Sequence, residues 1–241
     1  MKGERPGEIG RDYPDGWAYA PGTAALCAAF SALYALGMPG YDIPGLSFAC
    51  LVPLLILSTM SASARQAAWR GWLAGTLANL PLVYWIAYTV AVPGNLGWFL
   101  GGLAALLVSA FLGIYVSLAA LFAHLLRRRF GIAGLWGFPA AWVCVEYARS
   151  VLFTGFPWLL LGYGLSGDSR LRQAADLAGV YGLGFLLATA NVCLYIAGVS
   201  WVRGKRKVLF SHLAGAAAVA LFLSAYGAAG KASESRDARG G

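Results

Sequence analysis

The chain of 241 residues is 59% hydrophobic and only 12% charged, with a mean hydropathy of +0.66. Soluble domains are about 45–50% apolar and about 25% charged, so this composition excludes an ordinary soluble enzyme or binding domain. The formal net charge of +8 does not indicate a nucleic-acid partner, because the basic residues form short clusters between apolar segments and not one continuous face.

The amino-terminal residues 1–17 are polar, mix basic and acidic side chains, and contain several Gly and Pro. A cleaved signal peptide is not expected there, because its first region would be basic and not mixed. The sequence therefore predicts a flexible cytoplasmic lead over 1–17, a membrane domain over 18–229, and a polar, disordered tail over 230–241.

Seven apolar segments follow the lead, and each is close to or above the roughly 20 residues that a helix needs to cross a bilayer. They cover residues 21–38, 44–62, 68–91, 97–126, 133–153, 176–200 and 207–229. The predicted fold is all-α, a polytopic membrane protein with about seven transmembrane helices. We expect Pro53 and Pro81 to bend the second and third helices, and Gly101, Gly102 and Gly113 to let the fourth pack tightly or kink.

The distribution of lysine and arginine predicts how these helices are oriented. With the amino terminus in the cytoplasm, 12 of the 18 basic residues lie on cytoplasmic pieces, as the positive-inside rule requires. These are Lys2, Arg5, Arg11, Arg65, Arg70, Arg127, Arg128, Arg129, Arg203, Lys205, Arg206 and Lys207. The carboxyl terminus and the loop after residue 153 are then predicted to face outward.

The most specific stretch of the chain lies between residues 146 and 163, where an apolar segment stops and aromatic residues follow. Glu146 and Arg149 are three residues apart and would share one face of a helix. Charge at that depth in a membrane is costly and usually has a function. Pro157 cannot continue a helix and restricts the residue before it to extended conformations, so Thr154 to Trp158 should form a compact turn.

Five short motifs follow one another between residues 139 and 185. They are Pro139-Ala-Ala-Trp142, Glu146-x-x-Arg149, Thr154-Gly-Phe-Pro-Trp158, Gly162-Tyr163 and Gly179-Val-Tyr-Gly-Leu-Gly-Phe185. In order and spacing they resemble the membrane domain of apolipoprotein N-acyltransferase, and Tyr41-Asp42 and Tyr84-Trp85 are weaker echoes of it. The chain departs from the family pattern at Gly164-Leu165, where the family has Ser-Gln.

The resemblance implies a place in lipoprotein maturation at the bacterial inner membrane. In that family a periplasmic nitrilase-like domain with a Glu-Lys-Cys triad moves an acyl chain from a phospholipid to the amino group of a diacylglyceryl-cysteine on a lipoprotein. No position of this chain corresponds to the triad, so we expect no catalytic residue here. The chain alone is expected to be inactive, or to be completed by a separately encoded nitrilase-like domain.

The resemblance also implies substrate-binding residues. They are Glu146, Arg149, Gly155, Phe156, Pro157, Trp158 and Tyr163. The aromatic rings would form the lip of an apolar cleft for lipid tails, whereas composition alone makes them ordinary anchors at the membrane–water interface. For the two charged residues, recognition of a headgroup or a catalytic-domain loop competes with an ion pair that fixes two helices, and the ion pair is the preferred interpretation.

No cofactor or metal site is predicted, because the four cysteines lack a CxxC pair or metal-ligand spacing. Two other functions remain open. One is a non-catalytic membrane scaffold, and the other is a small-solute transporter, for which Glu146 is the one clear acidic candidate within a spanning segment. A further open point is whether the partner domain is nitrilase-like or a glycosyltransferase that acts on a lipid-linked sugar.

Overall fold

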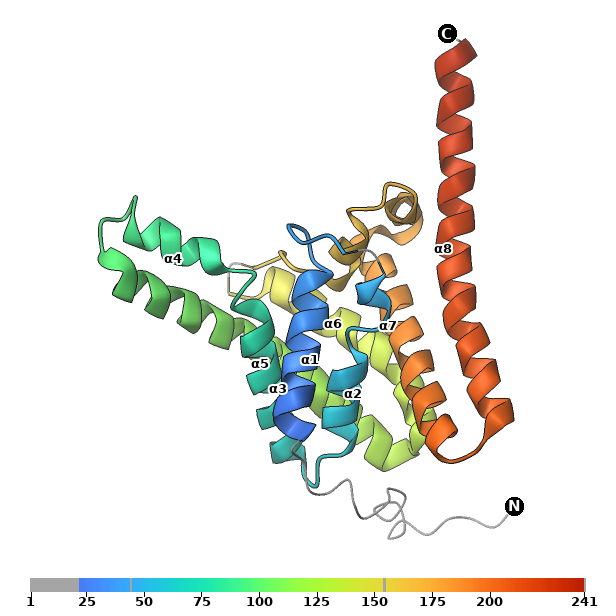
Figure 1. Cartoon of the computed structure of the whole chain (residues 1–241), viewed down its shortest axis with the longest axis horizontal. Coiled ribbons are helices and arrows are strands. Elements are labelled where there is room, and N and C mark those ends of the chain that lie inside the picture. The colour runs from blue at the N-terminus through green and yellow to red at the C-terminus, as the bar shows by residue number, and fades with distance from the viewer. Residues whose placement is uncertain (1–21, 44, 154, 241) are drawn as a thin grey trace.

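The computed structural model describes residues 22–43, 45–153 and 155–240, and Figure 1 shows them as helices joined by short connections. The elements are α1 (Gly22–Leu36), η2 (Leu46–Phe48), α2 (Val52–Thr59), α3 (Ala64–Asn79), α4 (Tyr84–Ala91), α5 (Gly97–Phe130), η3 (Ile132–Gly137), α6 (Phe138–Val151), η4 (Leu161–Leu165), η5 (Leu171–Ala174), α7 (Ala175–Val202) and α8 (Arg206–Gly240). No strand occurs among the described residues, which confirms the all-α class. The predicted lead over 1–17 lies outside them.

The described helices have the length and apolar character of a membrane protein. Three are long and apolar enough to cross a bilayer: α5, the stretch Leu171–Val202 that contains α7, and the part of α8 over Arg206–Gly230. The bent pair α3 and α4 would make a fourth, while α1 and Leu46–Thr59 are shorter apolar helices. The membrane fold is therefore established, whereas seven crossings and their orientation stay predictions.

The two prolines act differently from each other. Pro81 lies between α3 and α4, which meet at an angle of 59°, so the predicted bend is confirmed. Pro53 lies in the first turn of α2, where a helix tolerates proline because the missing N–H has no partner within the helix. The segment predicted over 44–62 is thus divided into η2 and α2, and Pro53 begins a helix instead of bending one.

Small residues bring α3 and α5 into close contact. A Cβ atom added at Gly75 of α3 would lie 2.6 Å from Cβ of Val116, and one added at Gly113 of α5 would lie 2.9 Å from the carbonyl oxygen of Trp72. Helices in lipid associate through such close backbone contacts, because the hydrophobic effect does not favour contact with another helix over contact with lipid tails. The predicted tight packing is confirmed at Gly113 and at Gly101, where an added Cβ atom would collide with the backbone of Ala87. It is wrong at Gly102, where an added Cβ atom would meet no atom within 4 Å, and α5 continues through all three as one helix.

The core of the bundle lies between α1, α2, α3, α5, α6 and α7, with fully buried side chains such as Phe30, Leu54, Phe138 and Leu187. Asn191 of α7 is buried there and connects α7 by hydrogen bonds to η2 and to the start of α2. Its Oδ1 accepts from the backbone N–H of Leu51 at 2.7 Å, and its Nδ2 donates to the carbonyl oxygen of Ser47 at 2.9 Å. A satisfied polar group inside an apolar core fixes which helices are neighbours.

The last helix, α8, packs along α7 and extends beyond the rest of the bundle (Figure 1). It continues to Gly240, so it includes nearly all of the tail 230–241, for which the polar composition predicted disorder. The structure differs there because Ala, Lys, Glu and Arg are good helix formers. Adding them to an existing helix also avoids the cost of nucleation.

The connections between helices gather at two ends of the bundle. In Figure 1 the α2–α3, α5–η3 and α7–α8 connections lie at the lower end, and the turn after α1 and the η4–η5 region lie at the upper end. The lower connections carry the basic clusters around residues 65–70, 127–129 and 203–207. This grouping agrees with the topology that the positive-inside rule predicts.

A reporter fusion tests that topology. Alkaline phosphatase fused after Tyr226, which lies in the part of α8 that extends from the lower toward the upper end, is expected to be active because that end should face the periplasm. A fusion after Arg129 is the control and should be inactive as a phosphatase but fluorescent as a GFP fusion. Fluorescence after Tyr226 without phosphatase activity would contradict an odd number of crossings.

Candidate functional site

The aromatic turn after α6 is compact. The helix ends at Val151, and Gly155 to Trp158 are not helical. The N–H of Gly155 donates to the carbonyl oxygen of Leu152 at 2.9 Å, and the N–H of Phe156 reaches back to that of Arg149 at 2.8 Å. The predicted turn is confirmed for residues 155–158, while Thr154 lies outside the described residues.

Glycine is required at position 155 for two reasons. Its φ of 76° lies in the left-handed region, which other residues rarely adopt. A Cβ atom there would also collide with the carbonyl oxygen of Ser150. The closed turn therefore depends on Gly155, as the sequence indicated.

Aromatic rings from two elements meet at this turn. The ring centroids of Phe156 and Trp158 are 5.8 Å apart, and Trp158 lies 5.3 Å from Trp85 of α4. Trp158 remains 54% exposed, and Tyr163, on η4, is 37% exposed. Trp85 was not among the residues predicted for the site, although the weak resemblance at Tyr84-Trp85 was the one sequence signal that pointed to it.

The chain leaves the turn through a strained residue. Leu159 has a φ of 58°, and Phe153, before the turn, has a φ of 51°. The left-handed conformation costs a residue with a Cβ atom roughly 1–2 kcal/mol, so it persists only where surrounding contacts hold it. Such strain collects at functional sites more often than elsewhere in a protein.

Three buried side chains hold the strained segment 159–161, and we call them the clamp: Tyr34, Glu146 and Arg149. The hydroxyl of Tyr34 and Nη2 of Arg149 both donate to the carbonyl oxygen of Leu159, at 2.6 and 2.9 Å. Oε1 of Glu146 accepts from the N–H of Leu161 at 2.6 Å. The clamp thus fixes the backbone on both sides of Leu160, directly after the aromatic turn.

Glu146 and Arg149 also form a loose ion pair. Their Oε1 and Nη2 atoms are 4.0 Å apart, and the two residues are 3% and 4% exposed. Both side chains turn inward, as their spacing and the cost of charge in lipid led us to expect. The sequence favoured an ion pair that fixes two helices to each other. The structure corrects this, because the pair joins α6 to the segment 159–161 and not to a second long helix.

Glycines allow close packing at the clamp and at η4 beside it. A Cβ atom added at Gly184 of α7 would lie 3.2 Å from Oε2 of Glu146. One added at Gly164 would collide with Oγ of Ser47 and crowd the backbone of Gly37. The second contact leaves no room for a larger side chain at position 164 of this chain unless Ser47 and Gly37 shift.

The clamp also shows what sequence reasoning missed. Tyr34 lies 125 residues before the carbonyl group that it binds, and no local pattern marks it. The five loop residues predicted for the site are close in sequence, so their grouping needed no tertiary information. Tyr34, Trp85 and Gly184 join the site only through the packing of α1, α4 and α7.

Comparisons with known proteins show which family the chain resembles in sequence. The family model described as the apolipoprotein N-acyltransferase N-terminal domain matches residues 30–193, a range that contains the clamp, the turn and Trp85. The apolipoprotein N-acyltransferase of Geobacter metallireducens is 41% identical over 166 residues, which are 68% of this chain and 31% of the relative. That of Bordetella bronchiseptica is 33% identical over 221 residues, 84% of this chain and 39% of the relative.

The extent of these matches defines what is shared. The chain spans about a third of the length of the curated relatives it matches. The matched part is the membrane domain, and it includes every residue predicted for the site. This chain therefore belongs to the family of the apolipoprotein N-acyltransferase N-terminal domain.

Proposed function

We propose that the chain is the lipid-holding membrane part of an apolipoprotein N-acyltransferase in a bacterial inner membrane. In the proposed reaction an acyl chain moves from a phospholipid to the N-terminal diacylglyceryl-cysteine of a lipoprotein. The observation that carries the proposal is the clamp. Three buried polar side chains hold a strained backbone segment, and this fixes an exposed aromatic turn at one end of the bundle.

The seven predicted residues take different roles in this proposal. Phe156 and Trp158, together with Trp85, would contact lipid tails at the lip of the cleft, where large rings with a polar edge suit the boundary of the membrane. Gly155 and Pro157 shape the turn that presents those rings. Glu146 and Arg149 are positioning residues, because their burial keeps them behind the loop. Tyr163 would extend the lip onto η4.

In this proposal a nitrilase-like domain carries out the covalent steps of acyl transfer. None of the seven residues offers the thiol nucleophile that acyl transfer through a thioester requires, so the proposal includes a nitrilase-like domain above the outward loop. That domain's cysteine would attack an ester bond of the phospholipid, forming a thioester and releasing a lysophospholipid. The lipoprotein's amino group would then attack the thioester, forming an amide and releasing the thiol. The membrane part supplies binding and orientation for both lipids.

Replacing the exposed tryptophan tests this proposal. With a nitrilase-like domain supplied, Trp158→Ala is expected to lower the rate of acyl transfer about tenfold, which corresponds to about 1.4 kcal/mol of lost transition-state stabilisation. The yield of folded protein should not change, because Trp158 is 54% exposed. Transfer is measured as conversion of diacylated to triacylated lipoprotein by mass spectrometry.

Trp201→Ala is the matched control, because that tryptophan is 73% exposed and lies at the end of α7. It should leave acyl transfer unchanged. Equal rates of acyl transfer by wild type and Trp158→Ala would show that the loop does not form the lipid entrance. Solute uptake by liposomes that Glu146→Gln abolishes would instead favour the transporter.

A further inference from the structure

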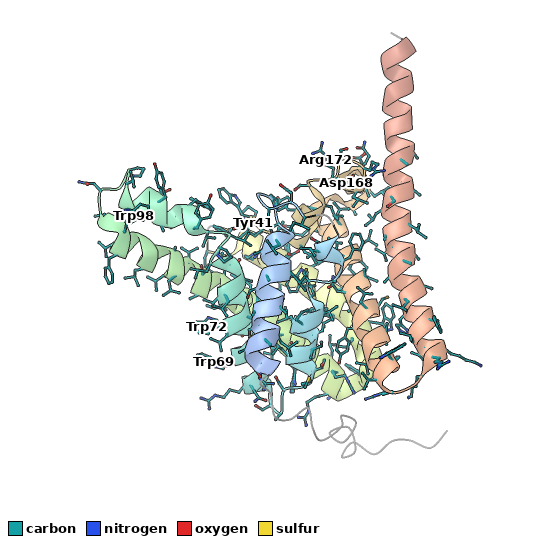
Figure 2. All side chains as sticks on the ribbon, viewed as in Figure 1. Tyr41, Trp69, Trp72, Trp98, Asp168 and Arg172 are labelled. Atoms are coloured by element: carbon teal, nitrogen blue, oxygen red, sulfur yellow. The ribbon has the colours of Figure 1, made fainter. Side chains whose placement is uncertain are left out.

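An open groove lies on the outer side of α3, against α5. Its volume is about 750 Å³, and its lining is formed by Ser63, Arg65, Gln66, Ala68, Trp69, Trp72 and Ser117. Figure 2 shows Trp69 and Trp72 at the lower end of the bundle, whereas Tyr41, Asp168 and Arg172 lie at the upper end. The groove lies along the first half of α3, whereas the aromatic turn contacts Trp85 of α4, which follows the other end of α3, so the groove is separate from the site of the proposed acyl transfer.

The apolar wall of the groove is fixed in place. Trp69 and Trp72 stack with ring centroids 4.9 Å apart and an interplanar angle of 25°. Nε1 of Trp72 donates to the carbonyl oxygen of Ala110 at 3.0 Å, and Oγ of Ser117 donates to that of Ala68 at 2.8 Å. Both hydrogen bonds tie α3 to α5 along the groove, so the wall is formed before any ligand arrives.

Positive charge lies at one end of this wall. Arg65, Trp69 and Trp72 follow one another at spacings of four and three residues and so share one face of α3. Nη1 of Arg128 donates to the carbonyl oxygen of Ala62 at 3.1 Å, which brings the basic end of α5 beside the start of α3. Among the described residues the ion pairs are Glu146–Arg149 and Asp168–Arg170, so no described carboxylate pairs with Arg65 or Arg128.

A ligand for this groove must carry a negative head and an apolar body. A small soluble anion would pair with Arg65 but would not contact Trp69 and Trp72. A neutral lipid would contact the two rings but would leave the charge of Arg65 without a partner. We propose that the groove binds an anionic phospholipid, with the phosphate at Arg65 and an acyl chain along Trp69 and Trp72. The predicted topology places this lipid in the cytoplasmic leaflet, where anionic lipids attract basic residues next to the membrane.

Binding is tested on the purified 241-residue chain by native mass spectrometry in detergent with added phosphatidylglycerol or phosphatidylcholine. Wild type is expected to retain phosphatidylglycerol selectively. Arg65→Gln should lower the apparent affinity for phosphatidylglycerol about fivefold, the contribution of one basic residue near an anionic membrane surface. Trp69→Ala should lower the affinity for the same lipid, and Arg65→Lys should keep most of it.

Arg206→Gln is the matched control, because it removes one positive charge from the same end of the bundle but lies on α8, away from the groove. It should bind phosphatidylglycerol like wild type. The proposal is overturned if phosphatidylcholine binds equally well, if Arg206→Gln loses as much affinity as Arg65→Gln, or if inorganic phosphate displaces the lipid. The thermal midpoint of each variant in the same detergent shows that binding was measured on folded protein.

Discussion

Arg149→Met is expected to lower the free energy of unfolding by about 3 kcal/mol, because it leaves the carboxylate of Glu146 buried without its positive partner. It also removes one of the two donors to the carbonyl oxygen of Leu159. Breaking a buried ion pair costs roughly 3–5 kcal/mol, and the separation of 4.0 Å between the charged atoms favours the lower end of that range. Unfolding is measured by titration with SDS in mixed micelles.

The double variant Glu146→Gln, Arg149→Met should lose less stability than either single variant. A glutamine side chain still offers an oxygen to the N–H of Leu161, and neither charge remains buried without its partner. Arg172→Met is the control, since this arginine is exposed at the same end of the bundle and should change stability by less than about 0.5 kcal/mol. Additive losses in the double variant would show that the two residues are not coupled.

Gly113→Ala is expected to destabilise the bundle by about 2–3 kcal/mol, because overpacking forces backbones apart. The added Cβ atom would lie 2.5 Å from Oγ1 of Thr76 and 2.9 Å from the carbonyl oxygen of Trp72. The second atom belongs to the backbone of α3, so no side-chain rotation can relieve the contact. The same SDS titration measures the loss.

Gly102→Ala provides a control in the same helix. No atom lies within 4 Å of a Cβ atom built there, so the substitution adds helix propensity without a clash. Its stability should equal or slightly exceed that of wild type. If Gly113→Ala were as stable as Gly102→Ala, close contact between α3 and α5 would not be a source of stability.

The sequence by itself determined the class of the protein and the local shape of the turn. A chain that is 59% hydrophobic and 12% charged belongs in lipid, whatever its tertiary arrangement. The turn at residues 155–158 follows from Gly155 and Pro157, because positive φ and a missing N–H act on the neighbouring backbone alone. The i,i+3 spacing of Glu146 and Arg149 likewise indicated a shared face, and both are buried.

Only the tertiary structure decided how the apolar segments are divided and which of them meet. The segment 133–153 became η3 and α6, and 68–91 became two helices at an angle of 59°. Tyr34 reaches Leu159 across 125 residues, and Trp85 meets Trp158 across 73 residues. In segments that are apolar on every side, hydrophobic periodicity does not mark the face that packs. Neighbours are chosen instead by small residues and buried hydrogen bonds, such as Gly113 against α3 and Tyr34 against Leu159, which form only once the helices have come together.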